Sequence, residues 1–180
     1  MSTALIVIDM QKEYSDSERP LHISGVETVA ENVKRLLEFF RSEDMEIIHV
    51  RHISDDPDDS TFSAGSSHVE FMDEINVEEN EPVVTKTNPG AFHGTDLDRI
   101  LMSKEVEKVV ICGLMSFLCT DTTAREAEAR GYETYYVRDT TDSIDLEELS
   151  SEEINRVVEA VQDFMFSEVM NTDQIIKKLG

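Results

Sequence analysis

The sequence predicts an α/β fold, in which a parallel sheet is covered on both faces by helices. Short apolar runs rich in β-branched residues alternate along the chain with longer segments whose apolar residues recur at helical spacing. Strands that alternate with helices form βαβ units, and the crossover connections make their strands parallel. The 180 residues contain no internal repeat, low-complexity segment or evident linker, so we expect one domain over residues 1–180.

Six segments are expected to contain strands. The first, TALIVIDM, is apolar almost throughout and ends near an acid, a pattern typical of a strand buried on both faces. The third is a short strand that ends before Pro89–Gly90. The loop 53–67 after the second strand is long enough to form a wall of an active site. The six expected strand segments are 3–10, 45–52, 81–92, 108–114, 132–139 and 167–171.

Five segments between and after these strands are expected to be helical. The second of them opens with Thr95 and carries Asp98 three residues later, which suits a helix start. Ser150 or Ser151 is expected to cap the fourth helix. The five expected helices lie within 25–44, 95–105, 113–131, 149–166 and 172–180.

The charge balance excludes several classes of partner. Lys and Arg number 16 against 39 Asp and Glu, a formal net charge of −23, and such a chain repels nucleic acid and anionic membranes. No apolar run is long enough to span a membrane, and the apolar N-terminus lacks the basic flank and cleavage site of a signal peptide. Two cysteines seven positions apart do not form a disulfide framework, which favours a cytoplasmic protein.

The acidic residues are spread through helices and loops and are not gathered in one tail. An ordinary solvated surface would explain them. Adaptation to high salt is the explanation we favour, because a chain this acidic repels itself unless cations screen its charges.

Three chemically distinct side chains are expected at one edge of the sheet. Asp9 ends the first strand, Lys86 ends the third, and Cys119 lies in the first turn of the helix after the fourth. Ligands of open α/β sheets bind at the carboxyl ends of the strands, where these three side chains are predicted to meet. Free N–H groups and the positive end of the helix dipole should favour the thiolate of Cys119.

This set of side chains suits hydrolysis through a covalent intermediate. Cys119 would attack an electrophilic carbon, and Asp9 would take the thiol proton and return it to a leaving group. Lys86 would hold Asp9 ionised and support the thiolate by its charge. Each residue alone has a structural alternative: a cap of the following turn for Asp9, a surface lysine for Lys86, and a small buried apolar residue for Cys119.

Four segments resemble the isochorismatase-like cysteine hydrolases. They are IDMQKEY, VVTKTNPGAFHGTDLDRIL, ICGLMSFLCTDTTAREAEARGYETYYVRDTTDS and FSEVMNTDQIIKKL. They occur in the family's order, and the likeness covers nearly the whole chain. The family includes N-carbamoylsarcosine amidohydrolases, nicotinamidases, ureidoacrylate-type amidases and true isochorismatases.

The resemblance implies a three-layer α/β/α sandwich of flavodoxin-like or Rossmann-like type with a six-stranded parallel sheet. It implies a triad of Asp9, Lys86 and Cys119, a non-proline cis peptide at Leu114–Met115, and an oxyanion hole formed by the N–H groups of Met115 and Cys119. The implied reaction hydrolyses a C–N bond in a small amide or carbamoyl compound. Cys119 would form a thioester, and water activated by Asp9 would release the acyl group without any cofactor.

Further residues are expected to contact the substrate. Gln11 and Tyr14 keep positions of the family's opening motif, while the aromatic candidates follow from their sequence neighbourhood. Phe92 is the favoured one because it lies near Lys86, although aromatic residues are more often part of the core. The expected substrate contacts are Gln11, Tyr14, Arg51, Phe62, Phe92 and Phe117.

A metal site is not expected. Nicotinamidases of this family carry one, with an Asp and a His after the second strand, but Arg51 and Ile53 stand at the matching positions here. His52 and His68 lie near several acids, which we interpret as solvated loop charges. Arg51 at the pocket rim would suit a substrate carboxylate, and an ion pair with nearby acids is the open alternative.

Two other functions stay open. An isochorismatase proper would cleave a vinyl ether by acid catalysis with Asp9 and would not require Cys119. A non-catalytic member would be a binding or assembly module. The presence of Asp9, Lys86 and Cys119 together favours the amidase. The resemblance also implies a homo-oligomer, a dimer or tetramer, besides the small-molecule substrate.

Overall fold

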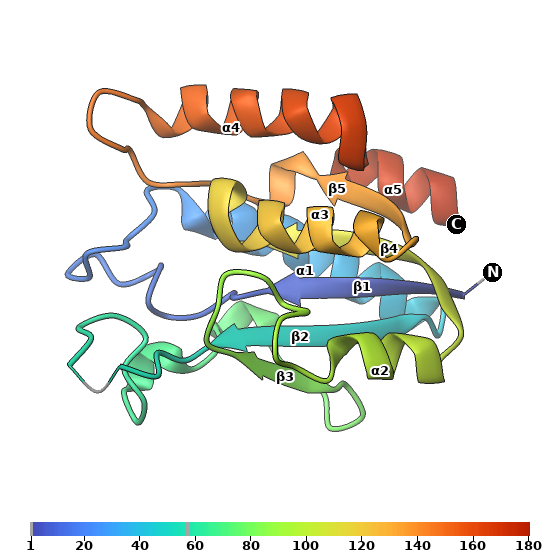
Figure 1. The fold of residues 1–180 in the computed structure, drawn as a ribbon, viewed down its shortest axis with the longest axis horizontal. Helices are drawn as coiled ribbons and strands as arrows, with labels where there is room; N and C mark the ends of the chain where they lie inside the picture. Colours follow the sequence, from blue (N-terminus) through green and yellow to red (C-terminus); the bar gives the residue numbers. More distant parts are fainter. Residues whose placement is uncertain (1, 57) are drawn as a thin grey trace.

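A computed structural model describes residues 2–56 and 58–180. Its centre is a six-stranded parallel sheet with the strand order β3-β2-β1-β4-β5-β6 (Figure 1). Each strand falls within a segment predicted from the sequence or extends it by one or two residues. The strands are β1 (Ser2–Ile8), β2 (Glu46–His52), β3 (Val83–Lys86), β4 (Val106–Gly113), β5 (Glu133–Val137) and β6 (Glu168–Met170).

Helices cover both faces of the sheet, which confirms the predicted three-layer architecture. One apolar core lies under α1 and α5, and a second lies under α2, α3 and α4. Every helix in the described part of the chain is too short or too polar to cross a membrane. The helices are α1 (Val26–Ser42), α2 (Leu97–Ser103), α3 (Asp121–Ala129), α4 (Ser151–Val161) and α5 (Thr172–Leu179).

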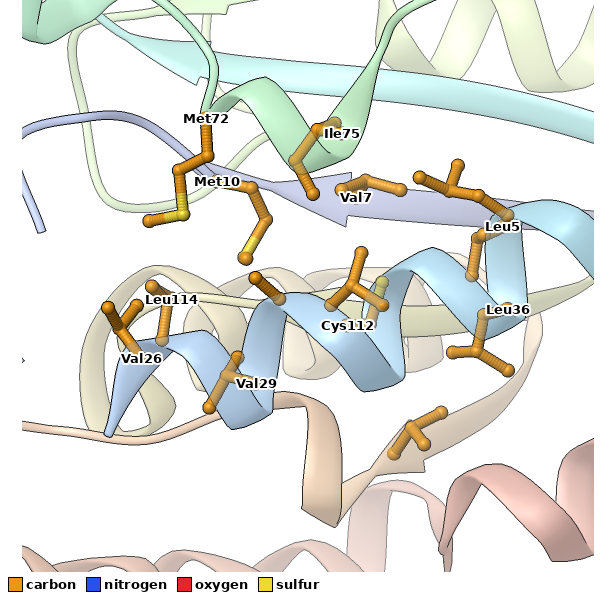
Figure 2. Packing of buried hydrophobic residues seen from close by; sticks show 14 of the residues in the cluster. Leu5, Val7, Met10, Val26, Val29, Leu36, Met72, Ile75, Cys112 and Leu114 are labelled. Atoms are coloured by element: carbon orange, nitrogen blue, oxygen red, sulfur yellow. The ribbon is translucent and has the colours of Figure 1, made fainter. Parts of the chain in front are cut away.

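The alternation of side chains along each strand divides the two cores. In β1, Leu5 and Val7 belong to the core under α1, while Ala4, Ile6 and Ile8 belong to the other core. Figure 2 shows Leu5 and Val7 of β1 in one cluster with Val29 and Leu36 of α1 and with Cys112 of β4. Cys112 is fully buried in this apolar core.

The chain changes direction between β1 and β4, and this leaves a crevice at their carboxyl ends. After β1 the chain adds β2 and β3 on one side, and then crosses to build β4, β5 and β6 on the other. Gly113 ends β4 with φ 117°, and a Cβ there would lie 2.0 Å from the Ile8 carbonyl oxygen. Only glycine allows this approach. It lets the Leu114 N–H donate to Ile8 O at 2.9 Å, so the segment leading to Cys119 starts beside Asp9.

Two helix starts refine the sequence prediction. Ser150 caps α4 through a reciprocal capping box with Glu153, so the first of the two candidate serines is correct. The helix expected to open at Thr95 begins at Leu97 instead. The Thr95 hydroxyl accepts a hydrogen bond from the Leu97 N–H at 3.2 Å and so still serves the first turn.

The acidic surface leads to a prediction about salt. We expect the free energy of unfolding to rise between 0.1 and 2 M KCl, because cations screen the repulsion among charges that sum to −23. A gain of about 1 kcal/mol would raise the Tm by about 2–4 °C in a chain of this length. Thermal unfolding at several KCl concentrations measures this shift, with sucrose as a non-ionic control. Equal stability in dilute buffer would remove the high-salt explanation.

Candidate active site

Asp9, Lys86 and Cys119 meet at the carboxyl edge of the sheet. Asp9 directly follows β1, Lys86 is the last residue of β3, and Cys119 lies in a π-helical turn, Ser116–Thr120, that precedes α3. Lys86 Nζ lies 2.7 Å from Asp9 Oδ2 and 3.2 Å from Cys119 Sγ. The structure thus brings together the three side chains that the sequence pattern predicted to meet, with the ammonium in contact with both others.

The Asp9 carboxylate is held at the strand end by its own backbone. Asp9 has φ 49°, a left-handed conformation that Asp tolerates better than most residues. Its N–H donates to Val50 O at 2.9 Å, which ties this turn to β2. Both carboxylate oxygens are buried, and neither accepts a well-directed hydrogen bond from the described residues. The contact with Lys86 is therefore an ion pair that leaves the lone pairs of Asp9 available for a proton.

Burial is the largest single influence on the pKa of each of the three groups. It raises the pKa of Asp9 above the ordinary 3.8, although Lys86 opposes the shift. It would lower the pKa of Lys86, but the charges of Asp9 and Cys119 reverse the effect, and the net pKa is raised. For Cys119, burial and the neighbouring Asp9 raise the pKa to about 12 against the opposing effect of Lys86.

The predicted resting thiolate is therefore wrong. The expectation considered only the helix N-terminus, whereas Cys119 is 5% exposed and shares its site with a carboxylate. Burial makes the thiolate costly, and the neighbouring Asp9 charge adds to that cost. Cys119 rests as a thiol beside Asp9, and it needs a proton acceptor at the moment of attack.

The segment before Cys119 supplies a free backbone donor. The Leu114–Met115 peptide is cis, at the position that the family resemblance implied. The Met115 N–H has no acceptor among residues 2–56 and 58–180, whereas the next N–H, of Ser116, donates to Asp142 O at 2.9 Å. The Ser116 hydroxyl is also fixed, by Asn155 of α4 at 2.5 Å. The Met115 N–H, one of the two expected oxyanion donors, is therefore free, and the hydrogen bonds of Ser116 hold the turn around it in place.

The structure adds His52, which sequence reasoning considered only as a metal ligand. His52 ends β2, and its Nδ1 lies 3.1 Å from Lys86 Nζ. Burial, followed by the charge of Lys86, lowers the pKa of His52 to about 4, so the ring is neutral at physiological pH. The signal that could have found it is its place at a strand end, the same criterion that selected Asp9 and Lys86.

Gln11 and Tyr14 lie near the site but have structural partners. Gln11 is fully buried, donates from Nε2 to His52 O and Val69 O at 2.9 Å each, and accepts the His52 N–H at 2.7 Å. Tyr14 is buried with its ring edge-to-face on Phe62. Gln11 therefore clamps the end of β2 and holds no free donor for a substrate.

Phe62 contacts the His52 ring, which in turn contacts Lys86. Its ring packs edge-to-face on the His52 ring with centroids 5.0 Å apart. Phe62 has φ 51°, and its N–H donates to the buried Glu13 carboxylate at 3.3 Å. The loop 53–67 thus supplies one wall beside the Lys86–His52 contact, as expected from its length.

Arg51 does not lie at the pocket rim. It pairs with Thr85 across the sheet, one position before the pair of His52 with Lys86. Because successive side chains in a strand point to opposite faces, Arg51 points away from the face that carries Lys86 and Cys119. Its Nε donates to the Thr85 hydroxyl at 3.0 Å. Within the described residues it forms no ion pair, so the alternative explanation is not supported either.

Phe92 is also displaced from its expected role. Its ring stacks on Tyr132 with centroids 6.1 Å apart, and the Arg130 guanidinium lies 4.5 Å from its centroid. Arg130 and Tyr132 both follow the carboxyl end of α3, whereas Cys119 precedes its amino end. Phe92 therefore packs the loop after β3 onto α3 and is not a wall beside Lys86.

Phe117 remains as an aromatic candidate at the site. It lies two residues before Cys119, is partly exposed, and packs against both apolar cores. Leu118 beside it is exposed as well. Asp9 and Lys86 are almost completely buried, so Cys119, at 5% exposed, is the most accessible residue of the triad. A substrate must be small to reach it.

No group of three or more His, Cys, Asp or Glu side chains in the described parts of the chain is arranged to hold a metal. His68 uses Nε2 toward Asp16 at 2.9 Å and Nδ1 toward the Ser66 hydroxyl at 3.0 Å. His52 faces an ammonium, which would repel a cation. The residues present thus do not fit a metal site.

A family model for the isochorismatase domain matches residues 3–174. The chain belongs to the isochorismatase family. Members of this family are hydrolases, and the present enzyme is one of them. It shares 31% identity with YddQ, an isochorismatase family protein of Bacillus subtilis, over 98% of this chain and 100% of that protein.

Other family members agree in fold and suggest the type of reaction. The crystal structure of a protein from Oleispira antarctica, described as an isochorismatase hydrolase, superposes with a TM-score of 0.91 at 30% identity. It covers 98% of this chain and 96% of that chain. The N-carbamoylsarcosine amidase of an Arthrobacter species is 24% identical over 98% of this chain and 70% of that protein. The relatives of this hydrolase therefore include an enzyme that acts on a C–N bond.

Proposed function

We propose that this enzyme hydrolyses the C–N bond of a small amide or carbamoyl compound through a thioester on Cys119. The observation that carries the proposal is the Lys86 ammonium, 2.7 Å from the Asp9 carboxylate and 3.2 Å from the Cys119 sulfur. A buried acid with free lone pairs beside a protonated thiol suits a proton transfer that accompanies attack.

The first half of the reaction releases the amine. The Cys119 thiol gives its proton to Asp9 as the sulfur bonds to the substrate carbonyl carbon. The carbonyl oxygen becomes an oxyanion, for which the Met115 N–H is a free donor and the Cys119 N–H the second. The tetrahedral intermediate then collapses. Asp9 returns its proton to the departing nitrogen, the C–N bond breaks, and a thioester remains.

The second half uses water. Asp9, again ionised, accepts a proton from a water molecule whose oxygen bonds to the thioester carbon. Collapse of this second intermediate breaks the C–S bond, and the proton on Asp9 returns to the sulfur. The product is a carboxylic or carbamic acid. Lys86 stays protonated throughout and offsets the negative charge that moves between Asp9 and Cys119.

A substrate screen with acid quenching tests this function. Small amides and carbamoyl compounds are incubated with the enzyme, ammonia or amine release is measured, and the quenched protein is weighed by mass spectrometry. We expect an acyl adduct on the peptide that carries Cys119. Iodoacetamide should also label Cys119 ahead of Cys112, which is fully buried in the opposite core. Release of pyruvate from a vinyl ether without any adduct would favour the isochorismatase reaction instead.

A further inference from the structure

The Lys86 ammonium has three N–H donors, and three acceptors surround it. Asp9 Oδ2 lies at 2.7 Å, His52 Nδ1 at 3.1 Å and Cys119 Sγ at 3.2 Å. The Lys86 side chain is shielded from solvent, so each donor must find its partner inside the protein. The Asp9 carboxylate faces the ammonium as an ion pair, Cys119 Sγ accepts one N–H, and His52 Nδ1 is placed to accept another.

We infer that His52 is a positioning residue, which holds the Lys86 ammonium between Asp9 and Cys119 by accepting one of its N–H groups. This role rests on the proposed function of the triad. It requires a neutral ring with a lone pair on Nδ1 and therefore the proton on Nε2. The Asn88 backbone is among the groups that raise the pKa of His52, although burial and Lys86 outweigh it.

The surroundings of His52 fix both its backbone and its ring. Gln11 binds the N–H and the C=O of His52 at 2.7 and 2.9 Å, so the end of β2 cannot move away from β1. Phe62 packs edge-to-face on the ring at 5.0 Å. His52 therefore meets Lys86 as a preorganised acceptor, and the angle of the ammonium is set before substrate arrives.

Three substitutions of His52 distinguish the effect of its hydrogen-bond acceptor from the effect of its volume. His52→Asn keeps an acceptor oxygen at the place of Nδ1, His52→Leu keeps the volume without an acceptor, and His52→Gln moves the acceptor one bond further. The readout is the rate constant for alkylation of Cys119 by iodoacetamide at pH 8, followed by peptide mass spectrometry. Since alkylation needs no substrate, this experiment can succeed even if the proposed amidase reaction fails.

We expect His52→Leu to slow Cys119 alkylation by about 10–100-fold, the range for loss of a hydrogen bond to a charged group. His52→Asn should stay within about threefold of the wild type, and His52→Gln should fall between them. With an identified substrate, kcat should follow the same order while KM changes little. Alkylation of the Leu variant at the wild-type rate, or equal losses in the Asn and Leu variants, would overturn the inference. Circular dichroism confirms that each variant is folded.

A second, independent observation concerns the outer side of α4 and the turn Gln162–Phe166 that follows it. Val157, Val161, Phe164 and Met165 form an exposed apolar stripe, and Phe164 is 87% exposed. The first three are spaced three or four residues apart, so they share one side of the helix. Figure 1 shows α4 at the periphery of the molecule. An apolar stripe on a chain of net charge −23 marks a contact surface.

We propose that a second copy of this chain covers the stripe, with its α4 antiparallel to the first. Arg156 and Asp163 are exposed beside the stripe, and neither forms an ion pair within the described residues, although Asp163 accepts the Val169 N–H at 3.4 Å. They lie at equal distances from the middle of the segment 156–163 and have opposite charge. A two-fold axis at that point brings Arg156 of each copy to Asp163 of the other, so the surface complements itself.

The oligomeric state tests this second proposal. Light scattering after size exclusion should give a dimer or a multiple of it, and Phe164→Glu should halve the mass. Met102→Glu is the matched control, because Met102 is 68% exposed on α2 and should tolerate the charge. Arg156→Asp or Asp163→Arg alone should weaken association at least about tenfold, and both together should restore it. A monomeric wild type, or an oligomer that survives Phe164→Glu, would overturn the proposal.

Discussion

Cys119→Ser is expected to lower kcat/KM by roughly 10⁴–10⁶-fold, the range seen when a covalent nucleophile is replaced. The hydroxyl is a poorer nucleophile than sulfur and far harder to deprotonate. Burial and Asp9 already raise the pKa of the thiol to about 12, and a hydroxyl at this place would resist ionisation still more. The measurement is ammonia or amine release from the substrate identified by the screen, together with loss of the acyl adduct.

Cys112→Ala is the matched control for this prediction. Cys112 lies on β4, fully buried among the apolar residues under α1 (Figure 2). Cys119 belongs to the core on the other face of the sheet. The Ala variant should lose some stability, because a small cavity forms in the core. It should keep its kcat/KM. Normal turnover by the Cys119→Ser variant would exclude the thioester.

The fold and the three central residues could be predicted because they depend on local pattern and on one topological rule. Buried parallel strands are apolar almost throughout, so their ends are visible where an acid or a lysine follows. Asp9 and Lys86 were found in this way. The rule that ligands bind at the carboxyl ends of strands then brings both to one edge, whatever the register.

The remaining site residues depend on side-chain direction and on distant partners, which one sequence does not show. Arg51 and His52 are neighbours, and only the register with Lys86 decides which of them faces the sulfur. Phe92 does not line the site because its ring stacks on Tyr132, forty positions away in the chain. The pKa of Cys119 follows from how deeply the turn is packed and from the charges of Asp9 and Lys86 beside it.

Asp9→Asn is expected to change two measurable rates in opposite directions. Turnover should fall by about 10²–10⁴-fold, because the amide cannot accept the thiol proton or return one to the leaving nitrogen. Alkylation of Cys119 should become faster, because the charge of Asp9 is among the causes that raise the pKa of the thiol. Each unit by which that pKa falls increases the thiolate fraction about tenfold. Asn also tolerates the left-handed backbone found at this position.

The pH dependence of turnover and of Cys119 alkylation should also differ between the wild type and Asp9→Asn. In the wild type, turnover should fall as the pH drops through the pKa of Asp9, which burial raises above 3.8, because the protonated acid cannot act as a base. The alkylation rate of the wild type should keep rising with pH beyond 9 without reaching a plateau, since the thiol titrates only near 12. In Asp9→Asn the acidic limb of turnover should disappear, and the alkylation curve should shift to lower pH.

Lys86→Met supplies the contrast that makes this result decisive. Without the ammonium, the pKa of Cys119 should rise further, and both turnover and alkylation should slow. A general loss of structure would stop turnover but would expose both buried thiols and speed the alkylation of Cys112 as well as Cys119. The specific role therefore predicts slower turnover with faster alkylation of Cys119 alone for Asp9→Asn. If Asp9→Asn alkylates no faster than the wild type, the charge of Asp9 does not hold back ionisation of the thiol, and burial alone sets the raised pKa of Cys119.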